Sequence, residues 1–438
     1  AAEHGSAAAD KPYYTADKYA TLTATADTGF GFAYWTGDVP DADKYDNPLL
    51  LRMDAPKHVT PVFLPAKTVT PYEGETPQEA INSFGAGGGV LFMEEGTYGY
   101  DTAAPALYLT TPVVVRGAGR DKTVIDGQAG KMRAVTIDNA IAAVIGVTVT
   151  NCVGGTSQGG DSMGSGLFIT ANGGRFLDGA VIGCRNSSCN GAIAMKGGRV
   201  SRSIVRANTS KIGGGIYMDN TSVPVVDNCL IAGNAANDQG GAIYFCGGTL
   251  LNCTIVNNRE TASGQYGGGG GVCLMSGSAR TVYNCIFQGN KATKTGNGAP
   301  DWFATSTAQG QTVDFRNNAM ENDLFKSQNP LPSVTFLADT DWVPSSASAT
   351  KDAGAVHSKQ SSRDLIGKLR VSGDAIDAGC YEFDDNVVGC SFAADPALVS
   401  TNGVTTLKAK VSGVEDESDL TFEWTVSNKT TDVVSFPV

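Results

Sequence analysis

The chain has few of the residues on which most catalytic sites depend. It contains three histidines, His4, His58 and His357, and all of them fall outside residues 130–300, where the sequence repeats. That distribution excludes histidine catalysis on the repeats. The sequence has no CxxC pair and no cluster of cysteine with histidine, so a zinc site is not expected. We therefore predict no metal site and no cofactor.

Long apolar segments and an excess of positive charge are lacking as well. No apolar run reaches the roughly 20 residues that a membrane-crossing helix needs. The formal net charge is −12 and 17% of the residues are charged, which argues against nucleic-acid binding, because phosphate contacts require concentrated lysine and arginine. Residues 1–5 lack the basic and apolar regions of a signal peptide, so export has to be inferred from the types of domain.

Glycine, in contrast, is abundant, with 55 residues, and part of it belongs to a repeated phrase. Two small residues followed by an apolar one recur five times, and the apolar positions are Leu167, Ile193, Ile216, Ile243 and Val272. Successive positions are 26, 23, 27 and 29 residues apart. A period in the twenties indicates a solenoid, because each unit buries its inward face only by stacking on its neighbours. We predict an all-β fold built on a right-handed parallel β-helix.

Cysteine and asparagine also recur at fixed positions in the repeats. One position is occupied by Cys152, Cys184, Cys229, Cys253 and Cys285. Five residues after this position, or after the serine that replaces it, come Asn208, Asn234, Asn258 and Asn290. Stacked equivalents lie about 4.8 Å apart, slightly too far for disulfides, so we predict a buried ladder of free thiols and an asparagine ladder in the turns. Cys380 and Cys390 are better candidates for a disulfide, and the sequence leaves that pairing open.

Residues 21–64 form a separate unit that follows an N-terminal extension, residues 1–20. The unit contains Gly-x-x-Phe and Trp-x-Gly-Asp elements, the Asn47-Pro48 pair and the Met53-Asp54 pair, in that order. It resembles the internalin-type B-repeat, also called the Listeria-Bacteroides repeat, a small β module of bacterial surface proteins. The resemblance implies a secreted or cell-surface setting and no particular reaction.

The β-helix is expected to span residues 65–383. Thr76, Pro77 and Glu79 form a capping box, which predicts a short helix near residues 76–84 that covers the first turn. Near the C-terminal end of the expected β-helix, an Asp-x-x-Gly-x-x-Arg-x-x-Gly pattern begins at Asp364. It is followed by an Asp-x-Gly-x-Tyr-Glu pattern just before residue 383. Together these signatures resemble bacterial β-helix proteins of the choice-of-anchor class.

Residues 384–438 resemble the first half of a bacterial immunoglobulin-like module. Strand-like runs occur at residues 404–409 and 420–426, but a complete sandwich of this type needs roughly 80 to 100 residues. The missing strands are expected either from a longer protein or from another copy. In the second case the segment around residues 13–15 would supply a strand, and the chain would assemble into a fibre.

The repeats carry no recognisable catalytic set. A glycosidase needs two carboxylates about 5 to 9.5 Å apart, which on a solenoid means acids on neighbouring turns at one register. The seven acids between residues 131 and 300 are scattered over different registers, and the clustered carboxylates of a calcium site are lacking. We predict no catalytic residue.

Thirteen basic residues lie in the same stretch. They favour either a groove for an anionic glycan or a solvated face that keeps the solenoid soluble. The tyrosines after the glycine phrase are expected either to stack on sugars or to pack in the core. The candidate ligand-binding residues are Arg199, Arg202, Arg206, Lys211, Tyr217 and Tyr244.

These features predict a non-catalytic extracellular protein of the cell surface, a stalk that serves adhesion, glycan binding or assembly. Its expected partners are glycans or other molecules of a host or cell surface. Neither nucleic acid nor a direct membrane span is expected. The alternative is a glycan-active β-helix enzyme of the polysaccharide lyase type that uses the basic face. Since one fold supports many functions, the fold alone does not decide between them.

Overall fold

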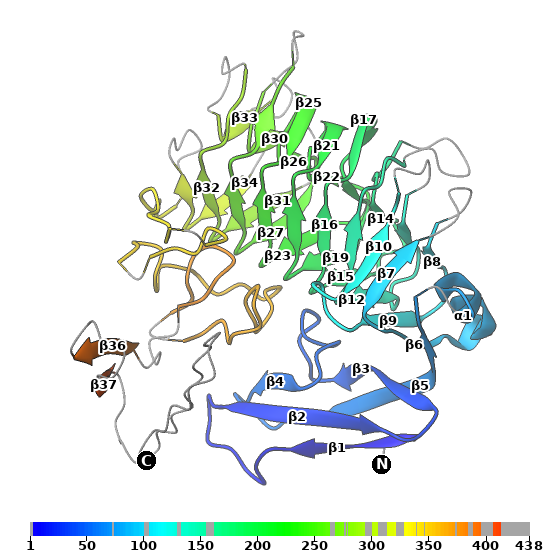
Figure 1. Ribbon diagram of the computed structural model, residues 1–438. Helices are drawn as coiled ribbons and strands as arrows, with labels where there is room; N and C mark the ends of the chain where they lie inside the picture. Colours follow the sequence, from blue (N-terminus) through cyan, green and yellow to red (C-terminus); the bar gives the residue numbers. More distant parts are fainter. Residues whose placement is uncertain are drawn as a thin grey trace, which may run out of the picture. The chain divides into compact units, whose positions relative to one another are not determined.

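The computed structural model describes residues 3–71, 74–99, 105–128, 133–154, 162–262, 268–275, 277, 279–293, 300–304, 313–320, 328–338, 340–345, 347–372 and 375–383, with the backbone of 389–395 and 406–412. The chain divides into two compact units, Ala1–Phe383 and Asp384–Val438. The larger unit combines a small N-terminal β module with a β-solenoid (Figure 1).

The N-terminal module contains an antiparallel sheet in the order β1 (Gly5–Ala9), β2 (Tyr19–Ala26) and β4 (Leu49–Arg52). Its small core includes Trp35, Leu49 and Phe63, all buried. Strand β1 lies in the stretch that the sequence assigned to an extension, so the module begins before residue 21. No apolar pattern marks β1 in the sequence, because its side chains are mostly exposed and the strand is held to β2 through its backbone.

One strand joins the module to the solenoid. The first part of β5 (Val59–Val69) pairs antiparallel with β3 (Phe30–Gly37). Its last residues, from Ala66 to Val69, pair in parallel with β6 (Gly89–Met93). The module and the solenoid therefore share one continuous sheet.

The cap of the first turn consists of α1 (Pro77–Ser83) followed by the 3-10 helix η1 (Gly85–Gly87). Thr76 and Glu79 form a complete capping box at the start of α1. Ala80 and Ile81 are buried against the solenoid core. The helix thus covers apolar side chains that an open solenoid end would expose to water.

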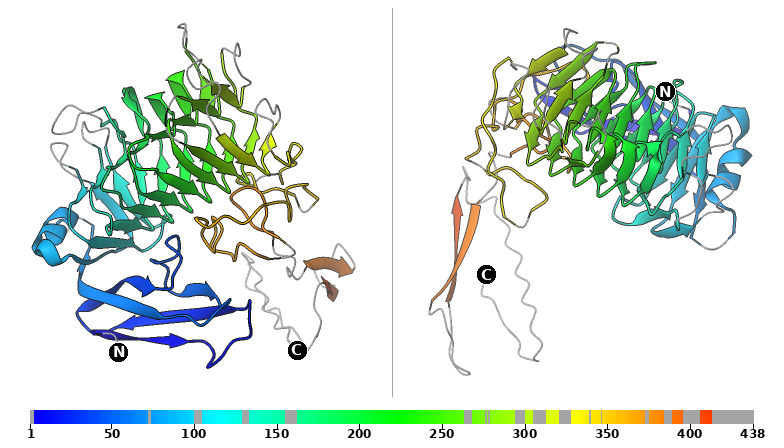
Figure 2. Two further views of the ribbon diagram at one scale, coloured as in Figure 1. Left: turned by 180° about the vertical axis from the view of Figure 1, so that it is seen from behind. Right: turned by 90° about the horizontal axis from the view of Figure 1, so that it is seen from above.

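The solenoid has about eight turns, and each turn contributes strands to several parallel sheets (Figure 2). After β3, β5 and β6, the eleven-stranded long sheet continues with β9 (Val113–Gly117), β12 (Ala143–Ile145), β15 (Arg175–Leu177), β19 (Arg199–Ser201), β23 (Val225–Asp227), β27 (Gly248–Leu251), β31 (Arg280–Tyr283) and β34 (Val313–Arg316). The nine-stranded sheet contains β7 (Gly96–Gly99), β10 (Thr123–Asp126), β13 (Thr148–Thr150), β16 (Ala180–Ile182), β20 (Ile204–Arg206), β24 (Leu230–Ala232), β28 (Thr254–Val256), β32 (Ile286–Gln288) and β35 (Ala319–Met320).

Two further sheets complete the turns. The eight-stranded sheet contains β8 (Leu107–Leu109), β11 (Val135–Ile137), β14 (Leu167–Ile169), β18 (Ile193–Met195), β22 (Ile216–Met218), β26 (Ile243–Phe245), β30 (Val272–Leu274) and β33 (Trp302–Ala304). A four-stranded sheet contains β17 (Arg185–Asn190), β21 (Thr209–Ile212), β25 (Ala235–Gln239) and β29 (Arg259–Glu260).

The repeated glycine phrase marks the eight-stranded sheet. Its five apolar residues, from Leu167 to Val272, pair with one another in register and belong to the main core. The glycines of the phrase allow neighbouring turns to approach closely. A Cβ atom added at Gly214 or Gly241 would lie 2.2 Å from the carbonyl oxygen of Gly241 or Gly270, respectively. Any side chain there would push the turns apart.

The asparagines form a continuous hydrogen-bonded column. The side-chain amide of Asn208 donates to Asn234, that of Asn234 to Asn258, and that of Asn258 to Asn290, each over 3.0 Å. All four side chains are buried. Positive φ falls on the residue before each of them, namely Ala207, Gly233, Asn257 and Gly289. The ladder asparagines therefore serve as buried hydrogen-bonding groups, and their neighbours adopt the left-handed turn conformation.

The cysteines at the second repeated position are buried thiols that form no disulfide, namely Cys152, Cys184, Cys229, Cys253 and Cys285. Cys229 and Cys253 interact with each other across adjacent turns, and so do Cys253 and Cys285. Cys380 is also a buried free thiol, and the side chain of Cys390 lies outside the described residues.

After the last turn, the chain returns along the outside of the solenoid. We call residues 347–383 the closing segment. Three of its backbone carbonyls accept hydrogen bonds from solenoid side chains. The carbonyl of residue 353 accepts from Asn317, that of residue 355 from Asn284, and that of residue 359 from Arg199. It then reaches Arg120, which donates to the carbonyl of residue 365. The closing segment thus runs from the last turns back toward the N-terminal module.

In the smaller unit, β36 (Gly389–Asp395) pairs antiparallel with β37 (Thr406–Ser412). The second strand-like run, residues 420–426, falls outside the described residues. The immunoglobulin-like assignment and the strand exchange between copies therefore stay predictions.

Candidate functional site

An aromatic column lies on the outer surface of the eight-stranded sheet. The middle residue of each short strand points away from the core, and Phe168, Ala194, Tyr217 and Tyr244 pair in register on consecutive strands. The rings of Tyr217 and Tyr244 are stacked, with centroids 5.4 Å apart and an interplanar angle of 13°. We call Phe168, Tyr217 and Tyr244 the aromatic strip. Both tyrosines are half-buried, so part of the stack faces solvent.

Polar and charged groups surround the aromatic strip. The guanidinium of Arg133 lies 4.8 Å from the ring centre of Phe168, and the amine of Lys196 lies 5.7 Å from it. Beside Tyr217, the carboxylate of Asp219 accepts a hydrogen bond of 3.3 Å from the phenol. Burial raises the pKa of both phenols above the ordinary value of tyrosine. The phenols therefore stay neutral and keep their capacity to donate hydrogen bonds.

The basic residues predicted to act with these tyrosines lie on other faces. Arg199 is on the long sheet, Arg206 on the nine-stranded sheet and Lys211 on the four-stranded sheet. Arg206 forms an ion pair of 2.7 Å with Asp341, and Lys211 is exposed. Residues 199–211 are close in sequence, but one turn of the solenoid distributes them around its circumference. The six candidate residues consequently do not form one groove.

Arg202 lies at a buried junction of three parts of the chain. Its guanidinium donates to Asp178 of the solenoid at 2.7 Å, to Asp46 of the N-terminal module at 2.7 Å and to Ser361 of the closing segment at 2.7 Å. The side chain is 1% exposed. Nothing in the sequence signalled this arrangement, because its members come from three segments without a common motif.

The pKa values of two carboxylates at this junction are shifted in opposite directions. Burial raises the pKa of Asp46 to about 7, despite the nearby charge of Arg202. For Asp178, burial is outweighed by the charge and hydrogen bonds of Arg202, and the pKa is lowered. They line a cavity of about 370 Å³ together with Arg116, Arg202 and Arg363.

A carboxyl of raised pKa beside an ionised carboxylate is a pattern of glycosidases. Here, however, Asp46 and Asp178 both accept hydrogen bonds from the same nitrogen of Arg202, at 2.7 and 2.9 Å. Three of their four carboxylate oxygens accept hydrogen bonds from Arg202 and so hold the parts of the fold together. The geometry therefore favours a structural ion-pair network.

The described residues contain no group of three or more histidine, cysteine, aspartate or glutamate side chains arranged to hold a metal ion. Cys246, beside the two tyrosines, has its pKa raised to about 11, mainly by burial. A thiol with that pKa is protonated at neutral pH and is a poor nucleophile. The surface around the aromatic strip is thus equipped for stacking and hydrogen bonding.

Comparison with protein families identifies two regions. Residues 1–67 match the divergent InlB B-repeat domain, and residues 133–322 match the right handed beta helix region. These matches confirm the predicted B-repeat and the right-handed parallel β-helix, and the first of them includes β1. Searches of curated proteins and of solved structures returned no significant match. B-repeat domains of this kind typically occur in surface proteins. Within the described part of the chain, every helix is too short or too polar to cross a membrane.

Proposed function

We propose that this protein is a non-catalytic protein of the cell exterior whose solenoid binds glycans through the aromatic strip. The observation that carries the proposal is the stack of Tyr217 on Tyr244, on an outward-facing column of consecutive turns. The B-repeat supports the extracellular setting, since such domains typically occur in surface proteins. Adhesion to a glycan-bearing surface is the role that follows.

The physical basis is the shape of the two surfaces. A pyranose ring presents an apolar face of C–H groups and an edge of hydroxyls, which match a flat aromatic face flanked by polar groups. Neighbouring turns of a parallel sheet repeat every ~4.8 Å, a spacing comparable to the length of one sugar unit. A linear glycan lying along the solenoid axis would therefore meet the rings of Tyr217 and Tyr244 on successive turns, whereas Phe168, two turns further along, is 6% exposed. Asp219 and Lys196, which follow paired residues on neighbouring strands, would contact its hydroxyls along one edge.

Isothermal titration calorimetry of the full chain with neutral linear oligosaccharides, such as cellohexaose, xylohexaose and mannohexaose, tests the proposal. We expect binding of at least one of them, weakened at least tenfold by Tyr217→Ala and by Tyr244→Ala. The matched control is Tyr13→Ala, because Tyr13 is 81% exposed and lies in the N-terminal module, away from the eight-stranded sheet. This variant should bind as the unchanged protein does.

The same oligosaccharides reveal turnover, through reducing ends or unsaturated products. The protein would be an enzyme if the unchanged chain cleaved one of these oligosaccharides and if Asp46→Asn or Asp178→Asn abolished the cleavage without loss of the fold. That result would overturn the proposed non-catalytic function. Absence of binding to a broad glycan array, or equal affinity of all three tyrosine variants, would refute glycan binding by the aromatic strip.

A further inference from the structure

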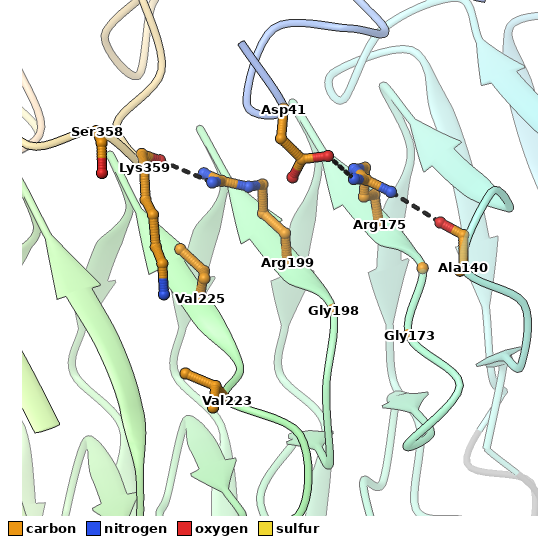
Figure 3. Close-up of a pocket in the computed structure, with 11 residues that line it drawn as sticks. Asp41, Ala140, Gly173, Arg175, Gly198, Arg199, Val223, Val225, Ser358 and Lys359 are labelled. Atoms are coloured by element: carbon orange, nitrogen blue, oxygen red, sulfur yellow. Dashed lines mark hydrogen bonds and ion pairs between the residues drawn. The ribbon is translucent and has the colours of Figure 1, made fainter. Parts of the chain in front are cut away.

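We infer a second binding site, for an acidic sugar residue that carries a carboxylate or a sulfate, in a pocket on the outer face of the long sheet. The pocket has a volume of about 400 Å³ and is lined by Arg175, Arg199, Val223 and Lys359, among others (Figure 3). It lies on a different sheet from the aromatic strip. The inference therefore goes beyond the proposed function and does not depend on it.

Three parts of the chain build this pocket. Arg175 and Arg199 are paired in register on β15 and β19 and point outward from the solenoid. Asp41 comes from the loop after β3 of the N-terminal module, and Ser358 and Lys359 come from the closing segment. The pocket consequently exists only in the assembled unit, where the module and the closing segment meet over the sheet.

The lining is predominantly cationic. Among the residues that line the pocket, Arg175, Arg199 and Lys359 are basic and Asp41 is the one acid. Asp41 forms an ion pair with Arg175, and Arg199 is paired with Asp227, which lies beneath the surface. Lys359 is exposed, and its amine lies 3.4 Å from the hydroxyl of Thr249. Its charge is therefore available to a ligand.

The two arginines are held in place and keep unused donors. Arg175 donates to the carbonyl of Ala140 at 2.8 Å, and Arg199 donates to the carbonyl of Lys359 at 2.7 Å. The exposed fractions of the two residues are 8% and 4%. Among the described residues, the Nε atom of each guanidinium has no hydrogen-bond acceptor. Because buried polar groups are nearly always hydrogen-bonded, these two buried nitrogens leave positive charge only partly compensated by the chain, and an anion in the pocket would compensate it further.

The shape of the pocket suits a ring as well as an anion. Gly173, Gly174 and Gly198 contribute no side chains, and Gly198 could not carry one, since its φ is 71° and a Cβ would lie 2.3 Å from the carbonyl oxygen of Gly174. Val223, 50% exposed, and Val225 add an apolar wall. The volume is within the range of about 300–1,000 Å³ typical of small-ligand sites.

An acidic sugar fits both parts of this lining. Its anionic group would accept hydrogen bonds from Lys359 and the guanidiniums, in the charge-assisted geometry that favours carboxylate and sulfate. Its C–H face would pack on Val223 and Val225. A simple inorganic anion would use the charges but not the apolar wall, so the combined surface distinguishes a charged ring from a free ion.

Calorimetric titration of the full chain with trigalacturonate and with a heparin tetrasaccharide tests the inference. Trigalacturonate methyl ester serves as the uncharged match and sodium sulfate as the free anion. We expect binding of at least one acidic oligosaccharide and at least tenfold weaker binding of the ester and of sulfate. Binding of the uronate alone would identify a carboxylate ligand, and binding of the heparin fragment alone would identify a sulfate ligand.

Lys359→Gln should weaken binding of the acidic oligosaccharide at least tenfold, and Val223→Glu should do the same by placing a negative charge on the apolar wall. Both side chains are exposed, so the fold should be retained. The matched control is Lys291→Gln, which removes another exposed charge, from a different sheet edge. An equal loss with Lys291→Gln would show general electrostatic attraction and overturn the inference. Equal affinity for sulfate and for the sugars, or no binding of either sugar, would overturn it as well. The neutral glycans of the aromatic strip are not used, so the two proposals fail independently.

Discussion

The hydroxyl of Ser361 donates a hydrogen bond of 2.9 Å to the carboxylate of Asp43, and the two residues are 318 positions apart in the sequence. Both side chains are buried. Ser361 also accepts a hydrogen bond from Arg202, so a single hydroxyl links the closing segment to the solenoid and to the N-terminal module. The three parts of the larger unit thus meet at this hydroxyl.

Loss of this hydroxyl should weaken the junction. In Ser361→Ala, Asp43 and Arg202 each lose a hydrogen-bond partner in a buried setting, which costs about 1–3 kcal/mol. We expect a lower urea midpoint and faster proteolysis of the closing segment. Ser222→Ala, at an exposed serine, should change stability by less than about 0.5 kcal/mol. Equal stability of the two variants would contradict a structural role of Ser361.

Replacing an asparagine in the interior of the ladder should destabilise the fold. Asn234 donates to the carbonyl of Val205 and to Asn258, and accepts from Asn208, all within buried surroundings. Asn234→Ala should therefore lower the free energy of unfolding by at least about 2 kcal/mol, as measured by urea denaturation. Asn257 is the exposed residue before Asn258 and has a φ of 54°, so Asn257→Gly should lower the free energy of unfolding by less than about 1 kcal/mol. A reversed order would show that the ladder contributes little.

Because neighbouring turns approach closely, we predict that adding a single methyl group at a glycine between them destabilises the fold. In Gly241→Ala the new Cβ would lie 2.2 Å from the backbone oxygen of Gly270, which cannot move without disturbing the next turn. We expect destabilisation of about 1–3 kcal/mol or more, read from the thermal midpoint. Gly87→Ala, where the added Cβ meets no atom within 4 Å, should be nearly neutral.

Buried carboxyls predict how stability depends on pH. The pKa of Asp46 is raised to about 7 and that of Glu382 to about 8, in both cases mainly by burial. Both exceed the values of about 4 in an unfolded chain, so the folded protein binds more protons between these limits. Stability should therefore fall as the pH rises from about 5 to 8, as measured by urea midpoints.

Asp46→Asn should reduce this decrease of stability with rising pH, because the amide does not titrate. Below about pH 4 the opposite trend should set in, since the pKa values of Asp41 and Asp178 are lowered in the folded state. Stability that rises steadily from pH 5 to pH 8 would contradict the assignment of protonated carboxyls to the folded protein.

Thiol labelling should follow burial. Cys246 is partly exposed, whereas Cys229 and Cys253 are buried and their pKa values are raised well above the ordinary range, mainly by burial. With iodoacetamide at pH 8, we expect Cys246 to react at least ten times faster than these two, as measured by mass spectrometry of peptides. In urea the rates should converge. Rapid labelling of Cys229 in the native protein would show that the core opens.

The sequence predicted those parts of the fold that repeat locally. The positions of Leu167 and Val272 recur with the period of one turn, so the core of the eight-stranded sheet could be read directly. The capping box at Thr76 is likewise a local signal, and the structure places α1 directly after it.

Contacts between distant segments left no such signal. Asp43 and Ser361 belong to different parts of the chain and share no period, so neither the junction nor the return path of the closing segment could be predicted. The candidate site was limited in the same way. Tyr217 and Tyr244 were singled out together because both follow the repeated glycine phrase, which left stacking on sugars and packing in the core as alternatives. The placement of Arg199 and Lys211, in contrast, depended on where each short strand begins.

The return of the closing segment also determines how the larger unit would carry a mechanical load. Cys380 and Tyr381 pack beside Leu230 and Val256, in the interior of the nine-stranded sheet and not at its last strand. A pull between Phe383 and β1 would therefore bypass the final turns and act across the contact of Ser361 with Asp43. The final turns would stay unstressed while the buried junction resists the tension.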